Sequence, residues 1–464
     1  MRRIFLASVL VLAVLTGPVS ANDEGVLHSK NIRSVSLKSA TEWIHRATFI
    51  GDVVYASYWF NGGGVDVFRT HPNGQLKRLA RFPCPGNGEG SITSWRHYIF
   101  QAVESPEGAN GLVEDVGTTP GPAFCGPADT GGIRVVDVSD PERPRMAGFI
   151  ELPCGSHGIT PFPFRGKLLI YNSNGCSGYS NFGGSSGQGG ILNTALFMEV
   201  IEFNEAHPSK SEIATKPKIE GMAGCHDVTV YPPRDLAVCT GTERFAMLDV
   251  SDPYNPKGYP PVDNLNTGPG SAQFTWDGTH VLMNTIPLRS HVEGESCLET
   301  GKTTGGMLIY NVEDPTNPVQ VGRIELERPP PMWEQGEGSY KCHASNFTVV
   351  PMRDRTRYVA VTTWGRAGLR VIDFSDPAKP LELAFWQPQW ANISWWGAWY
   401  NGHIYISENS AGEDNEVTSY VAPPSGPGIA DVRVLDMDGL GRRETLYFRD
   451  GLATQWQDPS NLRR

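Results

Sequence analysis

One motif is written four times along this chain in nearly the same letters: an alternating apolar strand followed by an acidic turn that contains proline. The four copies are IRVVDVSDPERP (133–144), FAMLDVSDPYNP (245–256), MLIYNVEDPTNP (307–318) and LRVIDFSDPAKP (369–380). Weaker copies begin at Val65, Glu199 and Val432, which brings the number to seven. Successive copies lie 47 to 70 residues apart, and a unit of that length has room for about four short strands.

Each copy predicts a strand and the turn that ends it. Val, Ile and Leu at every second position give the strand one buried face. The Asp-Pro pair ends the strand, because the proline ring pre-sets a turn and the Ser and Asp side chains bond local backbone amides. A further strand follows each turn and two more precede it, and the 52 glycines and 36 prolines suit this many turns. The sequence therefore predicts an all-β fold, a seven-bladed β-propeller of four-stranded antiparallel blades around a central channel.

The repeat phrase VxDVSDPxxP resembles that of the LVIVD-repeat family of extracellular propeller proteins. The resemblance runs from about Trp43 to Phe448. It implies the propeller fold, and it says little about function, because one fold carries many unrelated activities.

Two segments are candidates to complete the last blade and close the ring. Ile32 to Leu37 lies just before the first inner strand, in the place that the fourth strand of a preceding blade would take. Thr445 to Arg449 competes for the same place. The sequence does not choose between them.

The first 21 residues have the order of a secretory signal peptide. Arg2 and Arg3 give a basic start, residues 4–15 an apolar core, and residues 19–21 (Val-Ser-Ala) a small-residue cleavage site. The apolar run is too short to span a bilayer, and no later segment replaces it. We therefore expect a secreted or periplasmic protein in which residues 1–21 are removed and residues 22–464 form a single propeller domain. The formal net charge of −11 argues against nucleic-acid binding.

Four long insertions are predicted between the second and third strands of their blades. They span about residues 103–130, 173–194, 287–305 and 409–428. In a propeller the inner strand starts at the face that also carries these loops, so all four should crown one rim. Loops on a rigid scaffold often carry binding and catalytic residues, and we expect this rim to be the working face.

Four of the 11 histidines lie at the start of predicted inner strands, which converge on the channel mouth. They are His45, His157, His226 and His343, and Glu89 has the matching position in another blade. Neutral imidazole binds zinc, copper and iron alike. We therefore predict a metal site at these five residues, with copper or iron for redox chemistry or zinc for hydrolysis. The alternative is a structural role without metal, in which the histidines bond the backbone of the next blade.

Two uncharged residues at the same register, Gln273 and Trp396, are candidate contacts for a substrate. Trp396 belongs to a tryptophan-rich run and offers an aromatic platform at the channel mouth. The alternative for such aromatics is packing between blades. Asp227, which follows His226, is interpreted first as a turn residue and second as a partner that orients an imidazole.

The eight cysteines lie near the same rim, and an even number in an exported protein indicates disulfides. The natural pairing is Cys84 with Cys125, Cys154 with Cys176, Cys225 with Cys239, and Cys297 with Cys342. The adjacent pairs Cys225-His226 and Cys342-His343 suggest thiolate ligation of a metal as an alternative. Strand geometry disfavours it, because successive side chains point to opposite faces.

Two functions remain open at this point. The first is a metal-dependent enzyme, a redox enzyme by preference, that acts on a small molecule at the channel mouth. The second is a non-catalytic scaffold that binds an extracellular protein or glycan through its rim loops.

Overall fold

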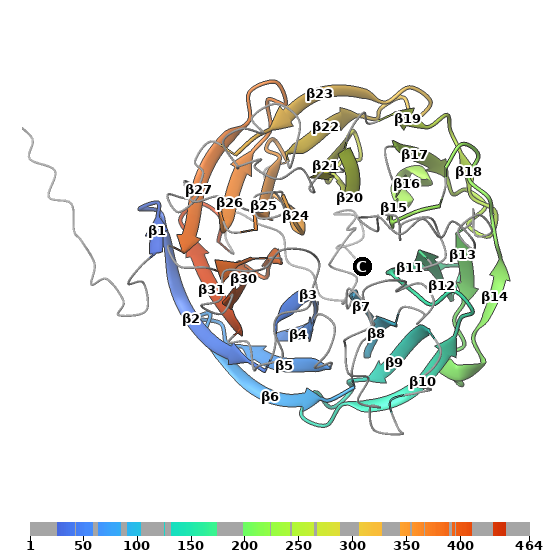
Figure 1. Cartoon of the computed structure of the whole chain (residues 1–464), viewed down its shortest axis with the longest axis horizontal. Coiled ribbons are helices and arrows are strands. Elements are labelled where there is room, and N and C mark those ends of the chain that lie inside the picture. The colour runs from blue at the N-terminus through green and yellow to red at the C-terminus, as the bar shows by residue number, and fades with distance from the viewer. Residues whose placement is uncertain are drawn as a thin grey trace, which may run out of the picture.

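The computed structural model shows a ring of seven β-sheets around a central channel (Figure 1). It describes residues 26–41, 43–58, 64–84, 91–103, 125, 131–173, 198–222, 224–241, 244–263, 267–287, 306–326, 344–352, 355–365, 367–388, 392–394, 396–410 and 430–441. Within each sheet the strands are antiparallel and follow the chain outward from the axis. The predicted all-β, seven-bladed propeller is therefore confirmed.

The first three blades each contain four consecutive strands. Blade 1 contains β3 (Ile44–Ile50), β4 (Val53–Tyr58), β5 (Val65–Thr70) and β6 (Leu76–Phe82). Blade 2 contains β7 (Ile92–Trp95), β8 (Tyr98–Val103), β9 (Gly132–Asp137) and β10 (Arg145–Glu151). Blade 3 contains β11 (Gly158–Phe164), β12 (Lys167–Ser173), β13 (Glu199–Glu202) and β14 (Glu212–Thr215), with the 3-10 turn η3 (Pro208–Lys210) before β14.

Blades 4 and 5 continue the pattern. Blade 4 contains β15 (Asp227–Tyr231), the 3-10 turn η4 (Pro232–Arg234), β16 (Leu236–Thr240), β17 (Arg244–Asp249) and two short strands against β17, β18 (Lys257–Gly258) and β19 (Val262–Asp263). Blade 5 contains β20 (Thr267–Phe274), β21 (His280–Pro287), β22 (Met307–Asn311) and β23 (Val319–Ile324).

The last two blades both receive a strand from the N-terminal segment. Blade 6 contains β24 (Phe347–Val350), β25 (Val359–Thr363), β26 (Leu369–Asp373) and β27 (Leu381–Pro388), and β1 (Val26–His28) pairs with β27 as a fifth strand. Blade 7 contains β28 (Asn392–Ile393), β29 (Gly397–Tyr400), β30 (His403–Ser410) and β31 (Ala430–Met437), and β2 (Ile32–Ala40) pairs with β31. The N-terminal candidate thus closes the ring. Thr445 to Arg449 lies outside the described residues.

The acidic turns of the repeat form as the sequence predicts. In the second copy Asp249 ends β17, and its carboxylate accepts a hydrogen bond from the backbone N–H of Ser251 at 2.9 Å. Asp252 then accepts from the backbone N–H of Tyr254 at 3.1 Å. The other three copies have the same bonds, from the backbone N–H two residues further on to an Asp or, at Asn311, an Asn side-chain oxygen. The shared bonds explain why the letters repeat so closely.

These turns predict a stability that depends on pH. Hydrogen bonds from the residues that follow hold the pKa below its usual value in the turn acids Asp140, Asp249, Asp252 and Asp314. A pKa that is lower in the folded chain stabilises the fold above the unfolded value of about 4, and this stabilisation is lost as the pH falls through the folded pKa. We expect a Tm that is steady near pH 6 and falls steadily below about pH 4. Thermal melts followed by circular dichroism check this, and an unchanged Tm down to pH 3 would contradict it.

Seven clusters of buried apolar residues fill the spaces between neighbouring blades. One joins Phe100 and Ile133 of blade 2 to Ile170 of blade 3, and equivalent clusters lie at the other six contacts of the ring, the seventh joining blade 7 to blade 1. The core therefore lies between the blade faces, and the channel is left to the inner strands. Hydroxyl groups link these strands, as where Thr229 donates to the carbonyl of Ala272 at 2.6 Å.

The strands that flank the four predicted insertions are the second and third strands of blades 2, 3, 5 and 7. Apart from their first residues and Cys125, the insertions lie outside the described residues. The predicted signal peptide also lies outside them. In the described part of the chain, no helix has the length and apolar character needed to cross a bilayer.

Candidate functional site

Three of the four predicted histidines lie at the starts of inner strands and are buried. His45 is the second residue of β3, and His157 and His226 immediately precede β11 and β15. Their relative exposures are 5%, 6% and 5%. His343 and Glu89 lie outside the described residues.

The structure brings His157 and His226 into direct contact across the boundary between blades 3 and 4. Their Nε2 atoms are 2.9 Å apart, and the ring centroids are 4.5 Å apart. The Nδ1 atom of His226 lies 2.6 Å from the carbonyl oxygen of Gly270, so this nitrogen carries the proton and donates it. When His226 is neutral, its Nε2 atom carries a lone pair that faces Nε2 of His157.

Asp227 lies beside this pair and is fully enclosed. Its carboxylate accepts a hydrogen bond from Ser271 Oγ at 2.6 Å and lies 3.9 Å from His226 Nδ1. Burial alone would raise its pKa, but Arg46, His226 and Ser271 together hold the pKa of Asp227 below its usual value. The carboxylate is therefore an anion at the channel and not the turn residue that the sequence first suggested.

Glycine at the start of β11 leaves the room that this carboxylate occupies. A Cβ atom on Gly158 would lie 2.7 Å from Asp227 Oδ1 and 3.0 Å from the carbonyl oxygen of His226. Blades 3 and 4 can therefore approach closely at the level of the two histidines.

Arg46 reaches the same carboxylate from blade 1. Its Nη2 atom is 3.4 Å from Asp227 Oδ2, and the two side chains are 14% and 6% exposed. A guanidinium in this place lowers the cost of burying the carboxylate beside two imidazoles. Sequence reasoning missed Arg46 although it follows His45 directly, because the contact joins blades that are far apart along the chain.

A cavity of about 70 Å³ lies on the other side of the channel. Its walls come from the inner strands of blades 1, 2, 6 and 7 and the residues next to them, and include Arg46, Phe49, Asn346 and Trp396. Trp396 is 4% exposed, and its ring lies 5.8 Å from that of Phe49. The predicted channel-side tryptophan thus packs between blades and also lines the cavity.

Gln273 is used within the scaffold. Its amide donates to the carbonyl of Phe347 at 2.7 Å and accepts from the backbone N–H of Val349 at 2.9 Å. These bonds join β20 to β24. Its role toward a substrate stays a prediction.

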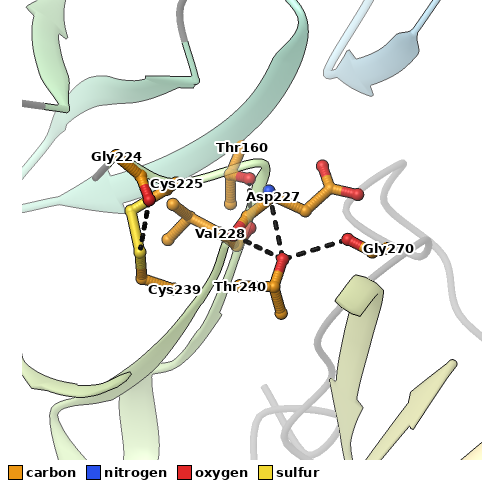
Figure 2. The surroundings of a disulfide bond; sticks show 8 residues. All are labelled: Thr160, Gly224, Cys225, Asp227, Val228, Cys239, Thr240 and Gly270. Carbon is orange, nitrogen blue, oxygen red and sulfur yellow. Dashed lines mark hydrogen bonds between the residues drawn. A yellow bond between two sulfur atoms is a disulfide. The ribbon is translucent and has the colours of Figure 1, made fainter. Parts of the chain in front are cut away.

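Two of the predicted disulfides are present, Cys84–Cys125 and Cys225–Cys239. Figure 2 shows the second one on one side of the β15–β16 hairpin while the Asp227 carboxylate points to the other. Thiolate ligation by Cys225 is thereby excluded. Cys154 is also in a disulfide, and Cys176, Cys297 and Cys342 lie outside the described residues, where their pairing stays a prediction.

Within the described ranges, no group of three or more His, Cys, Asp and Glu side chains is placed to hold a metal ion. Of the predicted ligands in those ranges, His157 and His226 are in contact, and His45 lies at the start of the inner strand of another blade. His343 and Glu89 lie outside the described residues.

Seven sheets of four or five strands closed into a ring define a β-propeller. The LVIVD repeat family model matches residues 357–384, which cover β25, β26 and the start of β27. This one-repeat match and the seven-bladed ring agree with the resemblance seen in the repeat letters. None of the curated proteins matches it.

Three solved structures are similar in architecture. A periplasmic gluconolactonase of Pseudomonas aeruginosa has a TM-score of 0.48 and 11% identity, and the match covers 73% of this chain and 84% of that one. A proposed 6-phosphogluconolactonase of Bacteroides fragilis has a TM-score of 0.45 and 12% identity, covering 76% and 83%. A protein of unknown function from Desulfotomaculum acetoxidans has a TM-score of 0.44 and 13% identity, covering 73% and 84%. We draw no conclusion about the activity of this chain from these values.

Proposed function

We propose that the channel mouth is a metal-dependent active site for a small molecule, with His157 and His226 as the centre of the ligand set. His45, His343 and Glu89 are the further ligands that the sequence indicates. The proposal is carried by one observation, the approach of two imidazole Nε2 atoms to 2.9 Å. Metal–imidazole distances are about 2.0–2.1 Å, so one ion can lie within reach of both nitrogens.

The surroundings of His226 support this assignment. Histidine ligands commonly donate the second ring N–H to a carbonyl or carboxylate, which fixes the ring and the tautomer. The Nδ1 bond to Gly270 does this for His226 and leaves Nε2 to bind. Bound copper or iron would supply redox chemistry, and bound zinc would supply a Lewis acid. We favour the redox role at a site outside the cytoplasm, where the two described disulfides are stable.

In a site without metal, the same contact is one hydrogen bond from His157 Nε2–H to His226 Nε2. This is the structural role considered for the histidines. A measurement of metal content distinguishes it from the metal-binding role. No observation on the described residues favours the scaffold function over the enzyme.

Elemental analysis of the exported protein, purified without a His tag, tests the proposal. We expect near-stoichiometric copper, iron or zinc in the parent protein and loss of most of it in a His157→Ala/His226→Ala variant. His280→Ala is the matched control, because His280 is half-buried in β21, outside this cluster, and should leave metal content unchanged. A parent protein that stays metal-free after reconstitution with each of the three ions would refute the proposal, as would a double variant that keeps its metal.

A further inference from the structure

The cavity lined by Arg46, across the channel from the histidine pair, has few polar groups in its described wall. Among the described residues that line it, Arg46 is the one charged residue. Asn346, Thr348 and Tyr400 are the other polar residues. The rest of the wall is apolar and largely aromatic, with Phe49, Trp396 and Trp399. Small-molecule sites commonly have this composition, an apolar wall with a few polar groups that fix orientation.

The two main polar residues of the wall also connect the cavity to the histidine cluster. Arg46 contacts Asp227, which follows His226. Asn346 Nδ2 donates to the backbone carbonyl of His45 at 3.4 Å. A molecule in the cavity can therefore contact two side chains that bond to His45 and to the residue that follows His226.

The size of the cavity limits the ligand. The volume of about 70 Å³ is about twice the roughly 30 Å³ that one molecule takes in liquid water, so the ligand is small. A guanidinium offers five N–H donors in a planar fork and binds carboxylates in matched geometry, so one guanidinium can bridge two of them. The aromatic wall suits a short hydrocarbon tail.

From these observations we propose that the cavity binds a short-chain monocarboxylate, with its carboxylate on Arg46 and its tail against Phe49 and Trp396. Binding in the cavity is independent of any metal. The role of the carboxylate as substrate rests on the proposed function.

Titration of the metal-free protein with butyrate, butyramide and butylamine tests the proposal. The three probes share a tail and differ in charge, and calorimetry or saturation-transfer NMR measures their affinities. We expect butyrate to bind at least tenfold more tightly than butyramide, and butylamine to show no binding. In Arg46→Gln the preference for butyrate should disappear, whereas Arg46→Lys should keep part of it.

A second variant keeps the test decisive if Arg46→Gln fails to fold. Ala398→Val places two more methyl groups on the cavity wall without changing any charge, and should weaken butyrate and butyramide alike by at least tenfold. Equal affinity for butyrate and butyramide in the parent protein, a preference for butyrate that survives in a folded Arg46→Gln variant, or unweakened butyrate binding in a folded Ala398→Val variant would overturn the proposal. Because the protein is metal-free in these titrations, their failure is distinct from a failure of the metal assignment, which elemental analysis reports.

Discussion

A chain that begins at Thr41 is expected to lose cooperative unfolding, because its ring has no closing strand. β2 is nine residues long and pairs with β31 from Ile32–Met437 to Ala40–Ala430. Its neighbours on the other side also depend on it, since Gln75 donates to the carbonyl of Val35 at 2.6 Å and the backbone N–H of Leu76 donates to Ser36 Oγ at 3.1 Å. Without β2, blade 7 loses its outermost strand and is left with an exposed edge at β31.

The matched control is a deletion that ends at Lys30 and removes β1 alone. β1 adds a short fifth strand to blade 6, so this variant should keep a cooperative transition with a modestly lower Tm. Both shortened chains are exported with the same foreign signal peptide in place of their own N-terminal segment. Their thermal denaturation is then measured. A synthetic peptide of residues 29–41 should restore part of the transition in the longer deletion. If the chain from Thr41 melts cooperatively at the parent Tm, the ring does not depend on this closure.

The fold could be predicted because its signal is local and repeated. Each Asp-Pro turn marks the end of a third strand within a few letters, and β9, β17 and β26 end at Asp137, Asp249 and Asp373 as predicted. The closing strand could not be chosen in the same way. Both candidate segments have strand-like alternation, and the choice depends on pairing with β31, which lies some 400 residues away for β2.

The site could be predicted only where neighbouring blades carry a functional residue at the same position of their inner strands. His157 and His226 both precede inner strands of adjacent blades, so their contact follows from the repeat. The bond from Arg46 to Asp227 joins blades 1 and 4, and it depends on the width of the channel and the reach of an arginine, which no local pattern encodes.

The buried arginines of the repeat also left a signal in the sequence, and the sequence analysis did not use it. Arginine stands at the second letter of three repeat copies, as Arg134, Arg370 and Arg433, in a strand that otherwise reads as apolar. All three side chains are buried, and each guanidinium bonds a glutamine or glutamate of another strand of its own blade. The recurrence was visible in the letters, but the partners were not.

Replacement of Glu408 by alanine is expected to destabilise the closing blade by about 3–5 kcal/mol, since it leaves a buried cation without its counter-ion. Glu408 binds Arg433 through two bonds, at 2.7 Å to Nε and 2.8 Å to Nη2, and the side chains are 4% and 2% exposed. The same carboxylate accepts the indole N–H of Trp386 at 3.0 Å, so the variant also orphans this donor. Arg433 in turn donates to Ser34 of β2 at 2.9 Å, which ties the pair to ring closure.

The double variant Glu408→Leu/Arg433→Met distinguishes two causes of the stability loss. One is the cost of burying an unpaired guanidinium, and the other is the loss of a stabilising ion pair. Removing both charges leaves no uncompensated ion, and apolar residues of similar volume often replace a buried pair with little loss. We therefore expect the double variant to recover most of the stability that Glu408→Ala loses, with the indole of Trp386 as the remaining cost. Denaturant unfolding of the parent, the single variants and the double variant gives the coupling energy. A loss below about 1 kcal/mol in Glu408→Ala, the range of an exposed pair, would show that solvent reaches the guanidinium and that the closing blade does not rely on this contact.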